Sequence, residues 1–367
     1  MVPPNVSAFP TYLYNDTAVF YTISVYKSMD TLIYEKTFSR ENLAVMENEY
    51  GIKIKKIQQL FTGADKDSFV YKATTDLDAL FFVKARTGYF NGSLFELPYL
   101  LAESIGGHII EPVKTLEGNL YLNAGDYIII LYPYINGKSA IAKPLKKDQW
   151  IEFGSALRKM HTLKLRPGSL QIPRESYDGR WRRALKKHME SLNNKNRSNV
   201  YIKQFLDLYD RKAELIKFII DNAEDISGRL KNSGNGFCLC HGDIHAGNLF
   251  IADDGELYIV DWDTLLMAPK ERDLMFIGGG VANTWNTKAE EALFYEGYGE
   301  REKVNQEIIS YYRFERIIVD LVEYYEQFFA EDFTDGSQVK NQKAIIEKIK
   351  SMFYPNGVVD MAFNSGR

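Results

Sequence analysis

The sequence predicts an α+β protein of two lobes, a small β-rich lobe followed by a larger helical one. Short apolar segments with strand character fill the chain up to about residue 135, and long amphipathic stretches with helical spacing follow. One β-hairpin signature interrupts the helical part near residue 255. The polar break at residues 136 and 137 separates the two patterns. We therefore expect an N-terminal extension over 1–40, a first lobe over 41–135 and a second lobe over 136–367.

The first lobe is expected to form a small antiparallel sheet with one main helix. "ENLAVMENEYGI" predicts a short helix that ends at Gly51. "KIKKIQQLFTGADKDSFVYKATT" and "ALFFVKAR" predict strands, with a turn around residues 63–66. "LPYLLAES" predicts the main helix, and "YIIILYPYI" predicts a strongly apolar strand before the break. The role of the tyrosine-rich residues 1–40 does not follow from their pattern.

The second lobe is expected to be mainly helical. "DQWIEFGSALRKMHTL" places Trp150, Phe153, Leu157 and Met160 along one helical stripe. Residues 199–226 and 307–333 read as long amphipathic helices. The hairpin signature consists of "LFIA" and "LYIV" on either side of "DDGE", in which Gly255 supplies a positive φ.

Composition excludes several classes of partner. The 367 residues are 45% hydrophobic and carry a formal net charge of −4, so neither nucleic acid nor an anionic membrane surface is an expected partner. No run of eighteen apolar residues predicts a membrane span, and the first forty residues do not resemble a secretory signal. The two cysteines, Cys238 and Cys240, are expected to be reduced thiols of a cytoplasmic protein. Nothing in the sequence indicates an oligomeric state.

The stretch "CLCHGDIHAGNLFIADDGELYIVDWD", residues 238–263, carries the chemistry. Its cysteines and histidines lack the second, distant ligand pair of a structural zinc site. The spacing of its oxygen-bearing side chains is more informative. Asn248 follows Asp243 by five positions, and Asp261 follows Asn248 by thirteen. The hairpin between them would return the chain and bring Asn248 and Asp261 together. A carboxylate for an attacking hydroxyl, and an amide and a carboxylate for Mg²⁺, are what phosphoryl transfer needs.

"HGDIHAGN" followed by "VDWD" resembles the signature of the aminoglycoside phosphotransferase family, whose members share the protein-kinase-like fold. "APKERDLMFIGGG", "FYEGYGE" and "YYRFERI" resemble its spectinomycin phosphotransferase branch more narrowly. The resemblance covers roughly residues 41–363. It implies a two-lobed protein-kinase-like fold whose helical lobe carries a catalytic β-hairpin, with ATP and Mg²⁺ as cofactors and a small molecule as acceptor.

The resemblance assigns roles within the catalytic stretch. Asp243 would orient, and help to deprotonate, the acceptor hydroxyl, although a loop carboxylate can also simply cap a turn. Asn248 and Asp261 would bind magnesium. Asp273 in "ERDL" would brace the catalytic loop, and His161 is expected to be a core histidine with its hydrogen bonds satisfied. Gly242 stands where protein kinases keep an arginine, and no Ala-Pro-Glu segment follows, which disfavours a protein kinase.

The nucleotide would be held by the first lobe. Lys84 would contact the α and β phosphates, paired with Glu96 or, as the alternative, Glu103. Glu96 is in register for the family helix, but "SLFE" also fits a capping box, and Pro98 is awkward for a helix that begins at Ser93. The turn containing Gly63, with backbone amides as far as Ser68, would arch over the phosphates. By the register of the family, the carbonyl of Pro133 and the amide of Ile135 would contact adenine.

The acceptor site should offer carboxylates, because aminocyclitol antibiotics carry protonated amines. The candidate acceptor residues are Asp263, Glu271, Asp320, Glu323 and Glu326, with Trp181 and Trp285 as possible walls. Such a charge run can equally be a solvated helix face, and either tryptophan can belong to the core. The expected function is phosphorylation of a hydroxyl of spectinomycin or a related aminoglycoside. The alternatives are a metabolic kinase of the choline, homoserine or methylthioribose type and a non-catalytic nucleotide-binding module.

Overall fold

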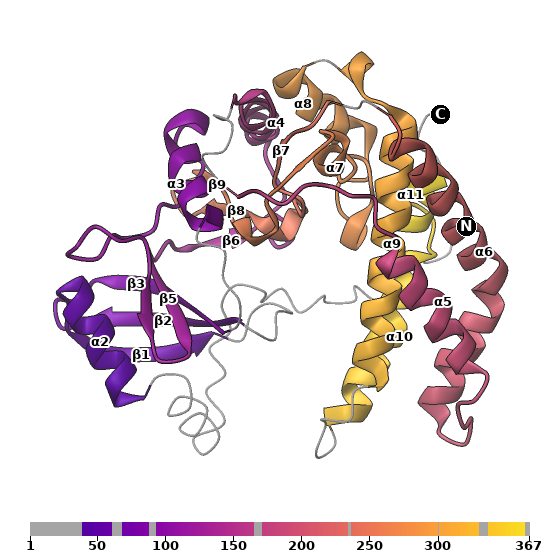
Figure 1. The fold of residues 1–367 in the computed structure, drawn as a ribbon, viewed down its shortest axis with the longest axis horizontal. Coiled ribbons are helices and arrows are strands. Elements are labelled where there is room, and N and C mark those ends of the chain that lie inside the picture. The colour runs from indigo at the N-terminus through magenta and orange to yellow at the C-terminus, as the bar shows by residue number, and fades with distance from the viewer. Residues whose placement is uncertain are drawn as a thin grey trace, which may run out of the picture. The chain divides into compact units, whose positions relative to one another are not determined.

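A computed structural model describes residues 39–60, 68–87, 93–164, 171–233, 236–299, 301–329 and 337–363 (Figure 1). The chain divides into two compact units. The first comprises Met1–Phe90, Ile110–Pro144 and Phe250–Tyr258, and the second comprises Asn91–Ile109, Leu145–Leu249 and Ile259–Arg367. Nearly all of the N-terminal extension and the turn containing Gly63 lie outside the described residues.

The first unit is built on a five-stranded antiparallel sheet in the order β1-β2-β3-β5-β4. Helix α2 (Arg40–Tyr50) precedes the sheet and ends at Gly51, whose φ of 64° lets its N–H bond back to the last turn. Met46 and Tyr50 of α2 pack with the inward-facing residues of the sheet into one buried core. The strands are β1 (Ile54–Leu60), β2 (Ser68–Thr75), β3 (Leu80–Arg86), β4 (Leu122–Ala124) and β5 (Tyr127–Pro133).

The predicted hairpin is present and gains a third strand. It consists of β8 (Leu249–Ala252) and β9 (Leu257–Ile259), and Gly255 between them has a φ of 99°. Strand β6 (Gly137–Ser139) pairs with β8 in antiparallel fashion. A side chain at Gly137 would place its Cβ 2.4 Å from the carbonyl oxygen of Ile251, so this close pairing requires glycine. The polar break seen in the sequence therefore begins a short strand.

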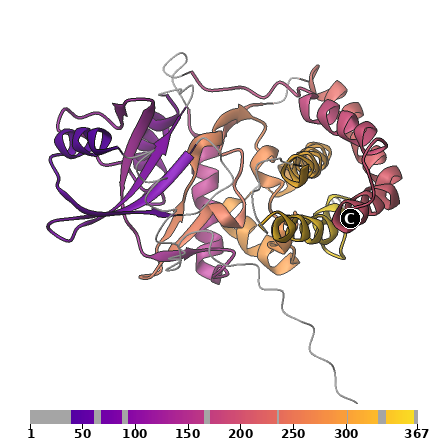
Figure 2. The same ribbon diagram turned by 90° about the horizontal axis from the view of Figure 1, so that it is seen from below.

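The second unit is mainly helical, with a two-stranded pairing of β7 (Cys238–Cys240) and β10 (Leu266–Ala268). Helix α9 is its centre, and α5, α6, α7, α10 and α11 all pack against it. Figure 2 shows α6 curving around the helices near the C-terminus. The helices are α3 (Ser93–Ile105), α4 (Lys147–Thr162), α5 (Arg180–Leu192), α6 (Val200–Leu230), α7 (Glu271–Leu274), α8 (Lys288–Tyr298), α9 (Gln306–Phe329), α10 (Ser337–Met352) and α11 (Val358–Phe363).

The stripe predicted on α4 is confirmed, since Trp150, Phe153, Leu157 and Met160 are all buried. Helix α4 packs closely on α8 because glycines lie at the crossing. A Cβ on Gly297 would come within 1.9 Å of the carbonyl oxygen of Ile151, and one on Gly154 within 2.2 Å of that of Phe294. Trp285 packs on the rings of Trp150 and Phe153, so it belongs to the core.

Helix α3 begins at Ser93 and contains Pro98, in contrast to the expectation that proline would disfavour this start. Proline has no N–H to donate to the residue four positions earlier, so the helix loses one hydrogen bond. Leu97, Leu101 and Ile105 are fully buried along one face, and this apolar contact holds the helix despite that loss. No helix in the described part of the chain is long and apolar enough to span a membrane.

Candidate active site

Asp243 lies at the centre of a hydrogen-bonded loop that follows strand β7. Its Oδ1 accepts a hydrogen bond from Nη1 of Arg316 at 2.8 Å, and its Oδ2 lies 3.5 Å from Nε2 of His245. Its backbone carbonyl accepts from the side-chain amide of Asn248 at 2.8 Å. The side chain is neither deeply buried nor freely solvated, with 29% of its surface exposed. The loop thus fixes the carboxylate while leaving it accessible.

Gly242 explains why this loop departs from the protein-kinase pattern. Its φ is 87°, and a Cβ there would come within 2.4 Å of the carbonyl oxygen of Thr264. Any side chain, including the arginine of protein kinases, would combine backbone strain with a steric clash. The hydroxyl of Thr264 also donates to the carbonyl of His241, so the two segments are locked together at this point.

Asp273 is fully buried and supports the loop that carries Asp243. Its carboxylate accepts the backbone N–H groups of His241 at 2.8 Å and Gly242 at 2.7 Å. It also lies 3.0 Å from Nε2 of His161, whose Nδ1 lies 2.8 Å from the hydroxyl of Tyr298. His161 is therefore a core histidine with both ring nitrogens engaged, and Asp273 has the bracing geometry that the resemblance implied.

The electrostatic environment keeps both aspartates ionised. Burial opposes ionisation of Asp243, but the hydrogen bond and charge of His245, together with the charge of Arg316, hold the pKa of this carboxyl well below its usual range. Burial likewise opposes ionisation of Asp273, but the hydrogen bond and charge of His161, with the charge of His241 and the N–H of Gly242, together lower the pKa of Asp273. Asp243 is therefore a carboxylate at neutral pH and a hydrogen-bond acceptor only.

Asn248 and Asp261 lie at the two ends of the hairpin. The N–H of Val260 donates to the carbonyl of Asn248 at 3.0 Å, and Nε2 of His241 lies 3.0 Å from the carbonyl oxygen of Val260. Asp261 follows in the left-handed region with a φ of 64°, which aspartate tolerates better than most residues. The amide nitrogen of Asn248 is bonded to Asp243, so its amide oxygen is the atom left for a ligand. An amide oxygen and a carboxylate are hard donors that fit Mg²⁺.

The residues proposed for the nucleotide occupy the strands of the first unit. Lys84 lies on the central strand β3, opposite Val70 of β2 and Ile130 of β5. Ser68 begins β2, Pro133 ends β5, and Ile135 follows two residues later. In the second unit, Glu96 is exposed in the first turn of α3, and Glu103 follows on the same helix. Pairing of Lys84 with either glutamate stays a prediction.

Two of the proposed acceptor residues are grouped beside Asp243. Asp320 is buried on α9, and its carboxylate forms an ion pair with Nε of Arg316 at 2.9 Å. Burial raises the pKa of Asp320 against the opposing charge of Arg316, and burial with the charge of Asp320 raises the pKa of Glu323. Arg316 therefore bridges the catalytic candidate and the acidic face of α9.

The other proposed acceptor residues lie elsewhere. Asp263 is partly exposed in the turn after Trp262, and Trp181 on α5 is partly exposed with the guanidinium of Arg180 over its ring. Glu326 is exposed and lies 3.4 Å from His188. The carboxylate of Glu271 is buried and accepts the backbone N–H of Asn305 at 2.9 Å, so it supports the local backbone.

Arg316 is the site residue that the sequence analysis missed. It lies within "YYRFERI", a segment noted only for its resemblance. A signal was present, because Arg316 and Asp320 stand four positions apart on a helix whose other faces are largely apolar. Its partner Asp243 is 73 residues distant in the chain, and local patterns do not report such a contact.

The sequence profile of the phosphotransferase enzyme family (APH) matches residues 96–313, more than half of the chain. The protein belongs to this family. It is thus an enzyme that transfers a phosphoryl group to a hydroxyl, and the expectation of a protein-kinase-like fold is confirmed. The solved structure of a spectinomycin phosphotransferase, APH(9)-Ia, in complex with ADP and spectinomycin has 33% sequence identity and a TM-score of 0.80, over 89% of this chain and 98% of that one.

More distant relatives have lower sequence identity to this chain. Protein StrN of Streptomyces griseus is 22% identical over 215 residues, which span 57% of this chain and 66% of StrN, slightly less than two thirds of its length. The amicoumacin kinase hAmiN, solved in complex with AMP-PNP, Ca²⁺ and Ami, has a TM-score of 0.59 at 14% identity over 92% of this chain and 100% of its own, and shares the fold.

Proposed function

We propose that this phosphotransferase uses ATP and Mg²⁺ to phosphorylate a hydroxyl of spectinomycin or a related aminocyclitol. The observation that carries the proposal is the 33% identity to spectinomycin phosphotransferase along almost the whole chain, with Asp243 at the centre of an organised loop. The acidic pair Asp320 and Glu323 on α9 supports it, because an aminocyclitol carries protonated amines that carboxylates attract.

The geometry suits a reaction that depends on positioning more than on proton transfer. Phosphoryl transfer passes through a loose transition state, in which little negative charge builds up on the nucleophile. A strongly acidic carboxylate such as Asp243 is a weak base, but it accepts a hydrogen bond from the acceptor hydroxyl and aims its oxygen. Mg²⁺ held by Asn248 and Asp261 would neutralise charge on the transferring phosphate.

The test is a comparison of acceptors with the purified full-length protein, ATP and Mg²⁺. ADP release would be measured with spectinomycin, an aminoglycoside, choline and homoserine, and the phosphorylated product identified by mass spectrometry. We expect kcat/KM for spectinomycin to exceed that for choline or homoserine by about a hundredfold or more, a difference that unpaired polar groups in a mismatched site produce. A preference for choline or homoserine would instead establish a metabolic kinase. Nucleotide binding without turnover of any acceptor would establish a binding module.

A further inference from the structure

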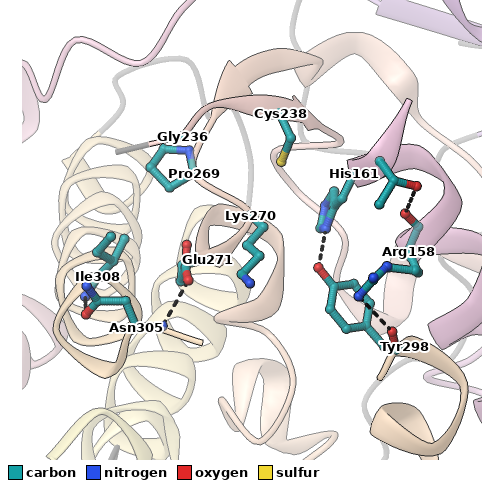
Figure 3. A pocket seen from close by; sticks show the side chains of 11 residues that line it. Arg158, His161, Gly236, Cys238, Pro269, Lys270, Glu271, Tyr298, Asn305 and Ile308 are labelled. Atoms are coloured by element: carbon teal, nitrogen blue, oxygen red, sulfur yellow. Dashed lines mark hydrogen bonds between the residues drawn. The ribbon is translucent and has the colours of Figure 1, made fainter. Parts of the chain in front are cut away.

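A cavity lies in the helical unit, and its lining does not include Asp243, Asn248 or Asp261. Its volume is about 370 Å³, and its lining includes Cys238 and Lys270. Figure 3 shows Cys238 and Lys270 on the wall of this cavity, with His161 and Tyr298 on one side. Neither the sequence signature nor the proposed reaction gives this cavity a task.

The two thiols beside the cavity differ in environment. Cys240 is fully buried, and its sulfur lies 3.5 Å from the carbonyl oxygen of Pro269, one of several acceptors within reach of its single proton. Cys238 is partly exposed and lines the cavity, with its sulfur 3.8 Å from that of Cys240. The hydrogen bond from Cys240, aided by the charge of His161, lowers the pKa of Cys238 against the effect of burial, whereas burial raises the pKa of Cys240. Cys238 is thus the nucleophile of the pair.

Two cationic side chains, Lys270 and Arg158, line the cavity. The ammonium of Lys270 has no hydrogen-bond or ion-pair partner among the described residues, although it lines the cavity. Arg158 also lines it and donates to the carbonyl of Tyr298 at 3.5 Å. The one carboxylate in the lining, that of Glu271, is engaged with the backbone N–H of Asn305. A ligand that carries carboxylates would be attracted to this wall.

We propose that Cys238 is a site of reversible modification, at which a small carboxylate-bearing disulfide of the glutathione type docks in this cavity and forms a mixed disulfide. The thiolate of Cys238 attacks one sulfur of the incoming disulfide, whose S–S bond breaks as the new one forms. The second thiolate leaves and takes up the proton released from Cys238. The protein thiol is oxidised and the small disulfide is reduced, so the exchange needs no other reactant.

The mixed disulfide is expected to persist. Cys240 would have to displace the adduct, but it is buried and protonated, and a bridge to a residue two positions away on one strand is strained. A metal is the competing occupant, since ligand atoms of His161, Cys238 and Cys240 lie within 4.8 Å of one another. Metal binding would take one ring nitrogen of His161 from its hydrogen-bond partner and would displace the proton of the Cys240 thiol. Thiol exchange requires none of these losses.

The experiment follows the intact mass of the full-length protein during incubation with glutathione disulfide and, in parallel, with the uncharged 2-hydroxyethyl disulfide. We expect one adduct on the wild type and on C240S, and none on C238S, with peptide mapping to place it on Cys238. Lys270→Met should slow glutathione exchange by roughly three- to tenfold, as loss of one attracting charge predicts, while exchange with the uncharged disulfide changes little. Lys217→Met, at an exposed position on α6, is the matched control.

Several outcomes would overturn the proposal. One is an exchange rate of Cys238 no faster than that of a free cysteine. Another is a mass loss of two hydrogens, which would signal a Cys238–Cys240 bridge. The third is that Lys270→Met slows exchange with the two disulfides equally. Protection of the thiol by stoichiometric Zn²⁺ in the purified protein would favour the metal site instead. Thermal unfolding of each variant identifies any that fails to fold, and the comparison of C240S with wild type then stands independently of C238S.

Discussion

Asp243 is held by a guanidinium and an imidazole at the point where the acceptor hydroxyl is proposed to bind. Arg316 contacts one carboxylate oxygen, and His245 lies near the other. These contacts lower the pKa of Asp243, which reduces its power to remove a proton but keeps it permanently able to accept a hydrogen bond. Asp243 is therefore best suited to orient the nucleophile.

Replacement of Asp243 by Asn should lower kcat by about 10²-fold or more, because the acceptor hydroxyl loses the carboxylate that positions it. Affinity for ATP should change little, because the role assigned to Asp243 concerns the acceptor. Steady-state rates and calorimetric nucleotide binding would test both statements. Asp126→Asn, at an exposed position away from the loop, is the control. A variant with a normal kcat would remove Asp243 from the mechanism.

Gly242 and Gly255 both have positive φ, but only one is crowded. A Cβ on Gly242 would lie 2.4 Å from the backbone of Thr264, whereas one on Gly255 would meet nothing within 4 Å. Gly255→Ala should cost about 1 kcal/mol of stability, from backbone strain alone. Gly242→Ala should cost several times more and also lower kcat, because the loop that carries Asp243 must shift. Urea unfolding of the two variants gives the comparison, and equal losses would contradict the steric argument.

At the scale of elements, α9 connects the site to the helical core. Its Arg313 donates to the carbonyls of Met275 and Ile277, while Arg316 on the same helix holds Asp243. Glu315, between them in sequence, is paired with Arg182 of α5. One helix thus aligns the loop that carries Asp243, the acidic face proposed for the acceptor and the packing of α5.

Glu315 should make stability depend on pH in a defined direction. Burial raises its pKa from 4.5 to about 7 despite the charge of Arg182. The folded state then binds a proton more tightly than the unfolded state, so Glu315 lowers stability progressively as pH rises from about 4.5 to about 7. This contribution is on the order of 3 kcal/mol.

The test is urea unfolding of Glu315→Gln and wild type across that pH window. Glutamine keeps a hydrogen-bond acceptor for Arg182 but does not ionise. The variant should therefore gain stability relative to wild type as pH rises. Glu190→Gln, at an exposed position on α5, should show no such trend. Parallel pH profiles for wild type and Glu315→Gln would disprove the raised pKa.

For the whole molecule, the sequence predicted best what is encoded locally. The stripe of α4, the hairpin around Gly255 and the spacing of the Asp243 loop depend on residues within about twenty positions. Contacts between distant segments were not predictable in the same way. The bond from Arg316 to Asp243 and the cavity around Cys238 arise only when helices, strands and loops separated by many residues fold together.

Ligand binding should stabilise the whole chain in a metal-dependent manner. ADP with Mg²⁺ at a hundred times its Kd should raise the free energy of unfolding by about 2.7 kcal/mol, since only the folded state assembles the site. Removal of Mg²⁺ with a chelator should abolish a large part of this increment in the wild type. Asp261→Asn should show the smaller increment even with Mg²⁺ present, because its amide lacks the charge of the proposed ligand, whereas Asp126→Asn should behave as the wild type. An undiminished Mg²⁺-dependent increment in Asp261→Asn would place the metal on other residues.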